Sequence, residues 1–239
     1  MKLTSKGFIH QLSFYPNLFP VNCYLIEESD ELTLIDTALP NSSSTILKAA
    51  ESIGKPISQI VLTHAHSDHI GSLDRLKESL PYAKVYMSEQ ESRLLAGDRS
   101  SVENETQNPV KGGIPKAGKI RTHPDFLIKE GDKIGSLRAI QTPGHSPGST
   151  SLIDERTGAI IAGDAFQTRG GIAVSGHLKP LFPFPALATW SKEKALASAV
   201  KIHSLNPSLL AVGHGPMLIE PADEIDRAII AFEKTLRKS

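Results

Sequence analysis

The residues best suited to chemistry form one dense cluster, His64-Ala65-His66-Ser67-Asp68-His69, directly after the apolar run 60–62. Imidazole and carboxylate groups are the ligands that zinc and related ions favour. Neutral His and ionised Asp are poor core residues, so such a density has little structural use. The alternative is an ordinary polar loop that is rich in His. We interpret the segment as a metal-binding loop at the end of a strand.

Three further candidate ligands each follow an apolar run. His145 follows residues 137–144, Asp164 follows residues 159–163, and His214 follows residues 209–213. Each run is typical of a short buried strand, with Gly or Pro just before the polar residue. In layered α/β folds, ligands bind beyond the carboxyl ends of strands. Four strand ends could therefore deliver seven ligands to one cleft.

The complete set of motifs resembles the metallo-β-lactamase-fold hydrolase superfamily. The resemblance extends from about residue 21 to residue 214, most of the chain. It implies an α/β fold, a four-layer αββα sandwich of two similar halves, with residues 1–239 in a single domain. The superfamily signature is His-x-His-x-Asp-His followed by a lone His, a lone Asp and a final His, which match His64, His66, Asp68, His69, His145, Asp164 and His214.

The first motif can serve two metals. His64 and His66 point the same way in an extended segment, because alternate residues share a face. Asp68 and His69 fall where the strand turns into a helix. One metal can therefore take His64 and His66, and a second can take Asp68 and His69.

The resemblance implies how the remaining ligands are used. His145 would complete the first site, His214 the second, and Asp164 would bridge both metals. Three protein ligands and an open position are the catalytic arrangement of zinc, not the closed structural one. We therefore expect two Zn²⁺ per chain, with iron or manganese as alternative metals.

This centre predicts a dinuclear zinc-dependent hydrolase. Two metals about 3.5–4 Å apart can share a hydroxide, and metal binding lowers the pKa of water toward ~7. The hydroxide would attack an electrophilic carbonyl or phosphorus and cleave an ester, lactone, thioester or related small-molecule bond. Asp68 is the expected catalytic residue, because it can orient the nucleophile. No general acid is assigned, since the four tyrosines lie outside the matched motifs: Tyr15, Tyr24, Tyr82 and Tyr86.

Residues around the motif are expected to support it. Asp36 ends a strand and matches a recurrent Asp of the resembled superfamily, so we expect it to hold the His-containing loop through hydrogen bonds. An ordinary turn Asp is the alternative. Thr63 and Gly71 are interpreted as geometric supports. Three other histidines are given no role in the chemistry: His10, His123 and His203.

Composition limits the partners. Lys and Arg (26) balance Asp and Glu (26), and aromatic residues are 5%, so neither a basic stripe nor base-stacking platforms for nucleic acid are expected. The one cysteine, Cys23, excludes an internal disulfide and is interpreted as a small buried hydrophobe. Residues 1–19 lack a signal-peptide core, and no apolar run is long enough to span a membrane. We expect a cytoplasmic protein with a small-molecule substrate and no nucleic-acid or membrane partner; a homo-oligomer is left open.

Periodicity and turn residues predict helices and strands in alternation. Helices are predicted at 42–53, 69–80, 192–205 and 221–237, with a short one opened by the capping box at 88–91. Strands are predicted at 21–28, 32–37, 59–63, 84–87, 149–154 and 159–162. Residues 97–124 form a long loop, interpreted as a lid or an oligomer contact. Residues 166–190 form a second connection, whose apolar stretch 181–185 and His177 lie in a predicted substrate loop.

Several alternatives stay open on the sequence. A mononuclear iron persulfide dioxygenase of the same fold resembles this motif, and a nuclease or a non-catalytic metal binder are further alternatives. The flavodiiron branch is disfavoured because it places Glu where His66 stands. A glyoxalase II is disfavoured because only one evident helix follows His214, and the commonest zinc β-lactamases carry Cys where Asp68 stands. The sequence does not identify the substrate.

Overall fold

The computed structural model describes residues 1–100 and 108–238. The chain divides into two units, one made of Met1–Asp98 with Gly113–Ile128 and the other of Arg99–Gly112 with Lys129–Ser239. Each unit contains its own β-sheet with helices, which confirms the α/β class. The single domain over residues 1–239 stays a prediction.

The first unit has a seven-stranded sheet in the order β1 to β7. Its first four strands are antiparallel, and β4 to β7 are parallel neighbours. Ile35 of β4 is paired with Val61 of β5, so the segments that follow these two strands leave the same edge of the sheet together. The strands are β1 (Lys2–Lys6), β2 (Ile9–Phe14), β3 (Val21–Glu27), β4 (Leu32–Ile35), β5 (Ile57–Val61), β6 (Lys84–Ser88) and β7 (Phe126–Ile128).

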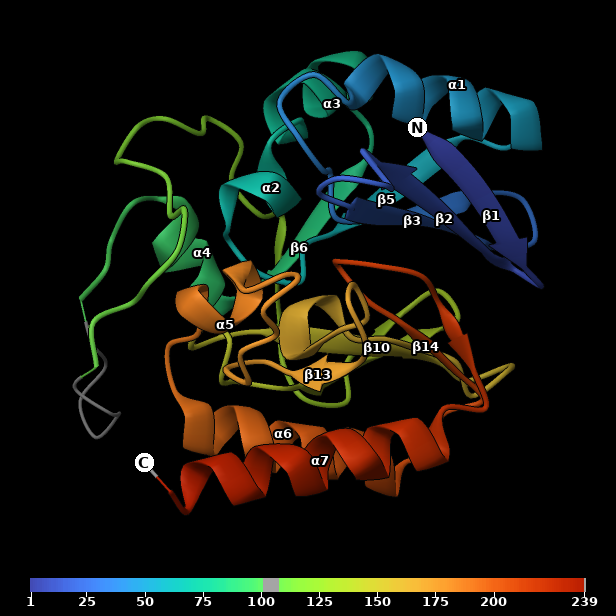
Figure 1. Ribbon diagram of the computed structural model, residues 1–239. Coiled ribbons are helices and arrows are strands. Elements are labelled where there is room, and N and C mark those ends of the chain that lie inside the picture. The colour runs from blue at the N-terminus through green and yellow to red at the C-terminus, as the bar shows by residue number, and fades with distance from the viewer. Residues whose placement is uncertain (101–107, 239) are drawn as a thin grey trace. The chain divides into compact units, whose positions relative to one another are not determined.

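Helices α1 (Ser43–Ile53) and α3 (Leu73–Ser79) lie on one face of this sheet (Figure 1). The amphipathic α1 buries Ile46 and ends at Gly54, whose positive φ of 85° lets its N–H cap the last turn. These bounds confirm the helix predicted at 42–53. The unit also contains α2 (Ser67–Ile70) and α4 (Glu89–Leu95).

The prediction of one helix over residues 69–80 is wrong. The chain forms two helices, α2 and α3, with Gly71 and Ser72 between them. Gly71 donates its N–H to the Ala38 carbonyl at 2.8 Å, and a Cβ at this position would lie 2.6 Å from the same oxygen. Gly71 therefore bonds to residue 38 where a continuous helix would bond to its own preceding turn. This close contact agrees with the supporting role predicted for Gly71.

The second unit has a six-stranded sheet in the order β15-β14-β11-β10-β9-β8. Its neighbours are antiparallel except β11 and β14, which are parallel with Ile161 paired to Ala211. The segments after these two strands therefore leave the sheet at the same edge. The strands are β8 (Lys133–Ile134), β9 (Leu137–Gln141), β10 (Thr150–Asp154), β11 (Ile160–Ile161), β14 (Leu209–Ala211) and β15 (Leu218–Ile219).

Helices α6 (Lys192–Ser204) and α7 (Ala222–Leu236) lie side by side along one face of this second sheet (Figure 1). Both confirm predicted helices. The face of α7 that carries Ile225 and Phe232 is buried in a core with Ile160 and Leu210 of the sheet. None of the helices in the described part of the chain is both long and apolar enough to cross a membrane.

The two long connections differ. Residues 108–124 contain no helix or strand, as predicted for the 97–124 loop, whereas its residues 101–107 lie outside the described ranges. Residues 166–190 contain more regular structure than a loop: the hairpin β12 (Phe166–Gln167) and β13 (Ala173–Val174), and the short helix α5 (Phe184–Ala188). Pro185 is compatible with α5 because it lies in the first turn, where its missing N–H is not needed.

Candidate metal centre

The His-rich motif follows β5 directly. His64, His66 and His69 are buried, and His66 precedes the first residue of α2 in an extended conformation. The ring centroids of His64 and His66 lie 4.7 Å apart, and those of His64 and His69 lie 4.0 Å apart. Burying three imidazoles this closely is costly unless they share a charged or coordinated partner.

Ligand atoms within the motif approach one another in the predicted pairs. Those of His64 and His66 lie within 4.8 Å, as do those of Asp68 and His69. Asp68 is only partly buried, whereas the other three predicted ligands of this motif, His64, His66 and His69, are buried. The first unit therefore brings the four predicted ligands of the motif together locally.

Asp36 organises the His-rich motif of the first unit. Its Oδ1 accepts the Thr63 N–H at 2.8 Å, and its Oδ2 accepts the Thr63 hydroxyl at 2.8 Å and His69 Nδ1 at 2.7 Å. The residue adopts the left-handed conformation (φ 58°), which Asp tolerates better than most residues. The carboxylate thus lies where the sequence predicted a supporting Asp.

The direction of these hydrogen bonds assigns the imidazole tautomers. Thr63 gives its one hydroxyl proton to Asp36, so Thr63 Oγ1 accepts in its 3.0 Å contact with His64 Nδ1. An ionised carboxylate only accepts, so His69 Nδ1 is also protonated. Both rings therefore keep the Nε2 lone pair for a metal.

Glu91 is a functional residue that the sequence reasoning missed. This residue of α4 is fully buried, and its Oε2 accepts the N–H of Ala65, the residue between His64 and His66, at 2.8 Å. The signal was present in the helix pattern, because Glu91, Leu94 and Leu95 share the buried face of α4. A carboxylate at an apolar position of a helix needs a buried donor, and the metal-motif backbone provides it.

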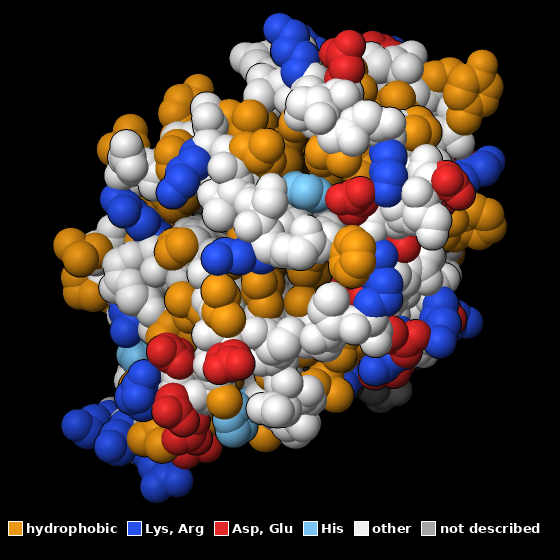
Figure 2. Space-filling view, turned by 90° about the vertical axis from the view of Figure 1, so that its right-hand side faces the viewer, with side chains coloured by type: hydrophobic (Ala, Val, Ile, Leu, Met, Phe, Trp, Pro, Cys, Tyr) orange, Lys and Arg blue, Asp and Glu red, His pale blue; other side chains and the backbone are white. Residues whose placement is uncertain are grey.

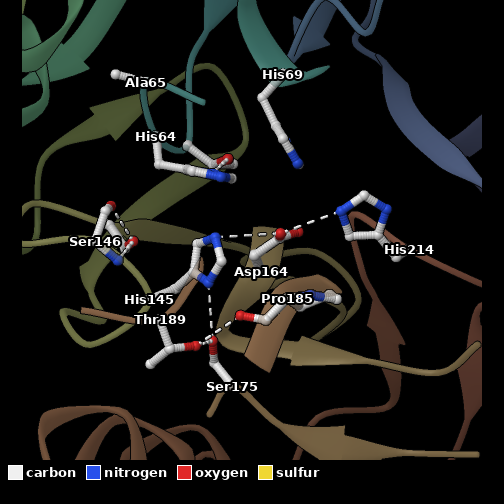
Figure 3. Close-up of polar contacts among 12 residues, drawn as sticks. His64, Ala65, His69, His145, Ser146, Asp164, Ser175, Pro185, Thr189 and His214 are labelled. Carbon is white, nitrogen blue, oxygen red and sulfur yellow. Dashed lines mark hydrogen bonds and ion pairs between the residues drawn. The ribbon is translucent and has the colours of Figure 1, made fainter. Parts of the chain in front are cut away.

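The second unit provides the other three predicted ligands. Asp164 lies in a one-turn 3-10 helix (Gly163–Ala165) after β11, His214 follows β14, and His145 follows β9. All three are buried. Asp164 Oδ2 lies 3.4 Å from His145 Nε2 and 3.2 Å from His214 Nε2. Both contacts are drawn as dashed lines in Figure 3. One carboxylate oxygen is thus held between two imidazole nitrogens.

Glycine allows His145 to reach this position. Gly144 has a φ of 144°, and a Cβ there would lie 2.3 Å from the backbone of Ala195 in α6. The adjacent backbone is clamped, since Ser191 donates its N–H to the Gly144 carbonyl and Trp190 to the His145 carbonyl, both at 2.9 Å. Gly144, the glycine just before His145 in the sequence, is therefore a site of close packing against α6.

These side chains fit a hydrolytic metal. Ligand atoms bound tetrahedrally at 2.0–2.1 Å from one zinc lie roughly 3.3 Å apart, and the two distances from Asp164 Oδ2 are close to this value. The donor set of imidazole nitrogens and carboxylate oxygens suits zinc, iron and manganese. Asp164 is the residue of this half that has two oxygens to share between ligand positions.

The 166–190 segment lies against one of the ligands. The ring of Phe182 is 5.3 Å from that of His214, and Phe182 also contacts Phe184 of α5 edge to face. His177 of the same segment instead stacks on Phe232 of α7 at 5.5 Å. Burial, with the Lys179 charge nearby, lowers the pKa of His177 below its ordinary value. His177 therefore packs on the helical core of its unit.

Cys23 is placed as expected. Its thiol is buried in β3, and burial, with a smaller contribution from the Asp36 charge, raises its pKa well above the ordinary value. A thiol with a raised pKa is a poor nucleophile at neutral pH. The interpretation of Cys23 as a small buried hydrophobe is confirmed.

Comparisons with known proteins agree on one family. The model of the metallo-beta-lactamase superfamily matches residues 16–214. The Bacillus subtilis protein YobT is 56% identical over 234 residues, covering 98% of this chain and 100% of its own length. A probable metallo-hydrolase of the same organism, YflN, is 29% identical over 213 residues, covering 81% of this chain and 80% of its own length. The crystal structure of TTHA1623 in a di-iron-bound form superposes with a TM-score of 0.64 and 25% identity, covering 89% of this chain and 96% of that one.

Proposed function

This chain belongs to the metallo-beta-lactamase superfamily, and on that premise we propose that it is a dinuclear metal-dependent hydrolase of small molecules. The family and the fold class that the sequence predicted are confirmed. Membership supports metal-dependent hydrolysis in general, as does the similarity to the probable metallo-hydrolase YflN. The proposal adds two metals and cleavage of an ester, lactone, thioester or related bond.

The observation that carries the proposal is the ligand geometry inside each unit. The first unit aims the Nε2 atoms of His64 and His69 away from their Asp36 and Thr63 partners. The second holds a carboxylate oxygen between two Nε2 atoms. We propose that His64, His66 and His145 would hold one metal and that Asp68, His69 and His214 would hold the second. Asp164 would be shared between the two.

The metal we propose is zinc, with iron or manganese as alternatives. The similar protein TTHA1623 was crystallised in a di-iron-bound form, which supports a two-metal centre here without identifying the metal. When bound, such metals lower the pKa of water toward ~7 and polarise the oxygen of the substrate. A cytoplasmic location stays part of the proposal.

The residues of the chain have distinct tasks. Asp68, which is partly buried beside buried histidines, would orient the attacking water in addition to holding a metal. Asp36 and Glu91 hold the motif, Asp36 through His69 Nδ1 and Thr63, and Glu91 through the Ala65 amide. This division lets one acid face the reaction while two buried acids keep the imidazoles in place.

A small molecule is the proposed substrate. The formal net charge is zero, and the basic side chains on the face drawn in Figure 2 are scattered among acidic and uncharged ones, apart from a small basic group at the lower left. Nucleic-acid binding would need a continuous basic surface. Exposed Leu181, Phe184 and Leu187, in and before α5, would suit an apolar substituent of the substrate. Neither a nucleic acid nor a membrane is part of the proposed activity, and a homo-oligomer is left open.

Metal content per chain tests the proposal. We expect about two zinc or other hydrolytic ions per chain by elemental mass spectrometry of protein purified without added metal, and hydrolysis of an ester, lactone or thioester panel that chelation abolishes. His66→Ala should lose both metal and activity, whereas His123→Ala, an exposed histidine outside the motif, should keep both. About one iron per chain, with oxygen uptake on a persulfide, would replace the hydrolase by the dioxygenase alternative.

A further inference from the structure

The ring nitrogen of His145 that faces away from Asp164 meets a buried chain of two hydroxyl groups. His145 Nδ1 lies 2.9 Å from Ser175 Oγ, which lies 2.8 Å from Thr189 Oγ1, which donates to the Pro185 carbonyl at 2.7 Å (Figure 3). The exposed fractions of His145, Ser175 and Thr189 are 1%, 1% and 3%. This chain of hydrogen bonds through Ser175 and Thr189, here called the relay, connects a candidate metal ligand with a backbone carbonyl of α5.

The last member of the relay sets its direction. A carbonyl only accepts, so the Thr189 hydroxyl gives its one proton to Pro185. Ser175 must then donate to Thr189, because Thr189 Oγ1 has no second proton. Ser175 has then used its own proton, so the contact with His145 is completed only by an Nδ1–H donor.

The backbone holds both ends of the relay independently of the imidazole. Ser175 donates its N–H to the Ala165 carbonyl at 3.0 Å, and Ala165 is the residue after Asp164. On the other side, Trp190, next to Thr189, donates its N–H to the His145 carbonyl at 2.9 Å. The hydroxyls are therefore positioned by the fold, and the ring adapts to them.

We propose that Ser175 and Thr189 are positioning residues that hold His145 as the Nδ1–H tautomer, so that Nε2, on the side of Asp164, keeps its lone pair for the proposed metal. This inference rests on the proposed metal centre. Without the Pro185 carbonyl, Thr189 could equally donate to Ser175 and Ser175 to His145 Nδ1. The ring proton would then lie on Nε2 and block coordination. The Pro185 carbonyl removes that symmetry, and so links the backbone of helix α5 to the metal affinity of His145.

Thr189→Val is the decisive variant, because Val has nearly the shape of Thr and residue 189 is separated from His145 by Ser175. Without the Thr189 hydroxyl, Ser175 can satisfy its proton by donating to His145 Nδ1. We expect zinc binding at one of the two sites to weaken about 10–100-fold, measured by competition with a chromophoric chelator. Ser175→Ala should weaken zinc binding as well. The double variant with Ser175→Ala and Thr189→Val should bind zinc no more weakly than Ser175→Ala alone, since no hydroxyl is left that could donate to His145 Nδ1.

The matched control is Thr142→Val. It removes the buried hydroxyl partner of Ser151 in the same unit, and Thr142 is not part of the relay. It should bind zinc like the wild type. Thr189→Ser keeps the hydroxyl and should restore wild-type affinity. Equal zinc affinity in Thr189→Val, Thr142→Val and wild type would overturn the relay, whereas a wild type that binds no metal would overturn the proposed function instead.

A direct measurement needs neither activity nor a stable variant. Long-range ¹H–¹⁵N correlation of metal-free wild-type protein, at an alkaline pH where imidazole is neutral, reports which ring nitrogen carries the proton. We expect a proton on Nδ1 of His145 in the wild type and on Nε2 in Thr189→Val. A wild-type ring protonated on Nε2 would overturn the inference even if Thr189→Val did not fold.

Discussion

Replacing Asp36 with Asn tests how the His-rich motif of the first unit is organised. Asn has the same size and is tolerated at the positive φ of this position, so the backbone is not strained by the change. The wild-type carboxylate accepts from three buried donors, the Thr63 N–H, the Thr63 hydroxyl and His69 Nδ1. A side-chain amide has one acceptor oxygen and two donor hydrogens, so it cannot reproduce this pattern.

Both orientations of the Asn side chain are unfavourable. If the amide nitrogen faces the Thr63 N–H, two buried donors oppose each other. If it faces His69, the ring must accept at Nδ1 and carry its proton on Nε2, the atom proposed to bind metal. A charge-assisted hydrogen bond contributes about 1.5–3 kcal/mol, and an unsatisfied buried donor costs about 1–3 kcal/mol. Because Asn is also cheaper to bury than a charge, we expect a net loss of about 2–4 kcal/mol in the free energy of unfolding.

Two assays separate the consequences. Urea unfolding of metal-free protein gives the stability loss, and chelator competition gives the zinc affinity, which we expect to fall about 10–100-fold. Asp30→Asn, at an exposed turn, is the matched control and should change neither quantity. If Asp36→Asn unfolds at the same urea concentration and binds zinc as tightly as Asp30→Asn, the assignment of Asp36 as the organiser of His64 and His69 is refuted.

Three further predictions concern other buried groups. Glu91→Ala leaves a buried amide in the metal loop without its acceptor and should cost about 1–3 kcal/mol by urea unfolding, whereas Glu91→Gln keeps an acceptor oxygen and should lose less; equal losses would refute the contact. Gly71→Ala should destabilise by about 1–3 kcal/mol, because its Cβ would lie 2.6 Å from the Ala38 carbonyl, and a variant as stable as the wild type would contradict that geometry. Burial raises the pKa of Asp74, but hydrogen bonds from the Thr122 hydroxyl and from the Arg121 and Thr122 amides outweigh it, so the folded-state pKa is lowered. The ionised Asp74 therefore stabilises the folded state above its unfolded-state pKa, and this stabilisation is lost as pH falls through the folded-state pKa. We expect Asp74→Asn to lower the free energy of unfolding by about 1 kcal/mol near neutral pH and to have no effect in strong acid. A difference in stability that does not change with pH would refute this prediction.

Local patterns predicted much of this protein. The four motif ligands of residues 64–69 are adjacent in the chain, and the three later ligands each follow an apolar strand, so their roles could be proposed before any contact was known. Helices α1, α6 and α7 were predicted because each has an apolar face at helical spacing. Periodicity failed at residues 69–80, where an apolar stripe continues although the helix does not.

Tertiary structure decided how the ligands are held. Glu91 contacts Ala65 across 26 positions of the chain, and Ser175 contacts His145 across 30. Ser and Thr are common on protein surfaces, so their types and local spacing carry no sign that Ser175 and Thr189 are buried beside His145. The helix pattern indicates that Glu91 is buried, but not which donor it meets. The candidate metal ligands could be predicted from the sequence because coordination needs rare residue types close together. The proton on each imidazole depends on which hydroxyl, carboxylate or carbonyl the fold brings to its second nitrogen, and only the packed structure determines that.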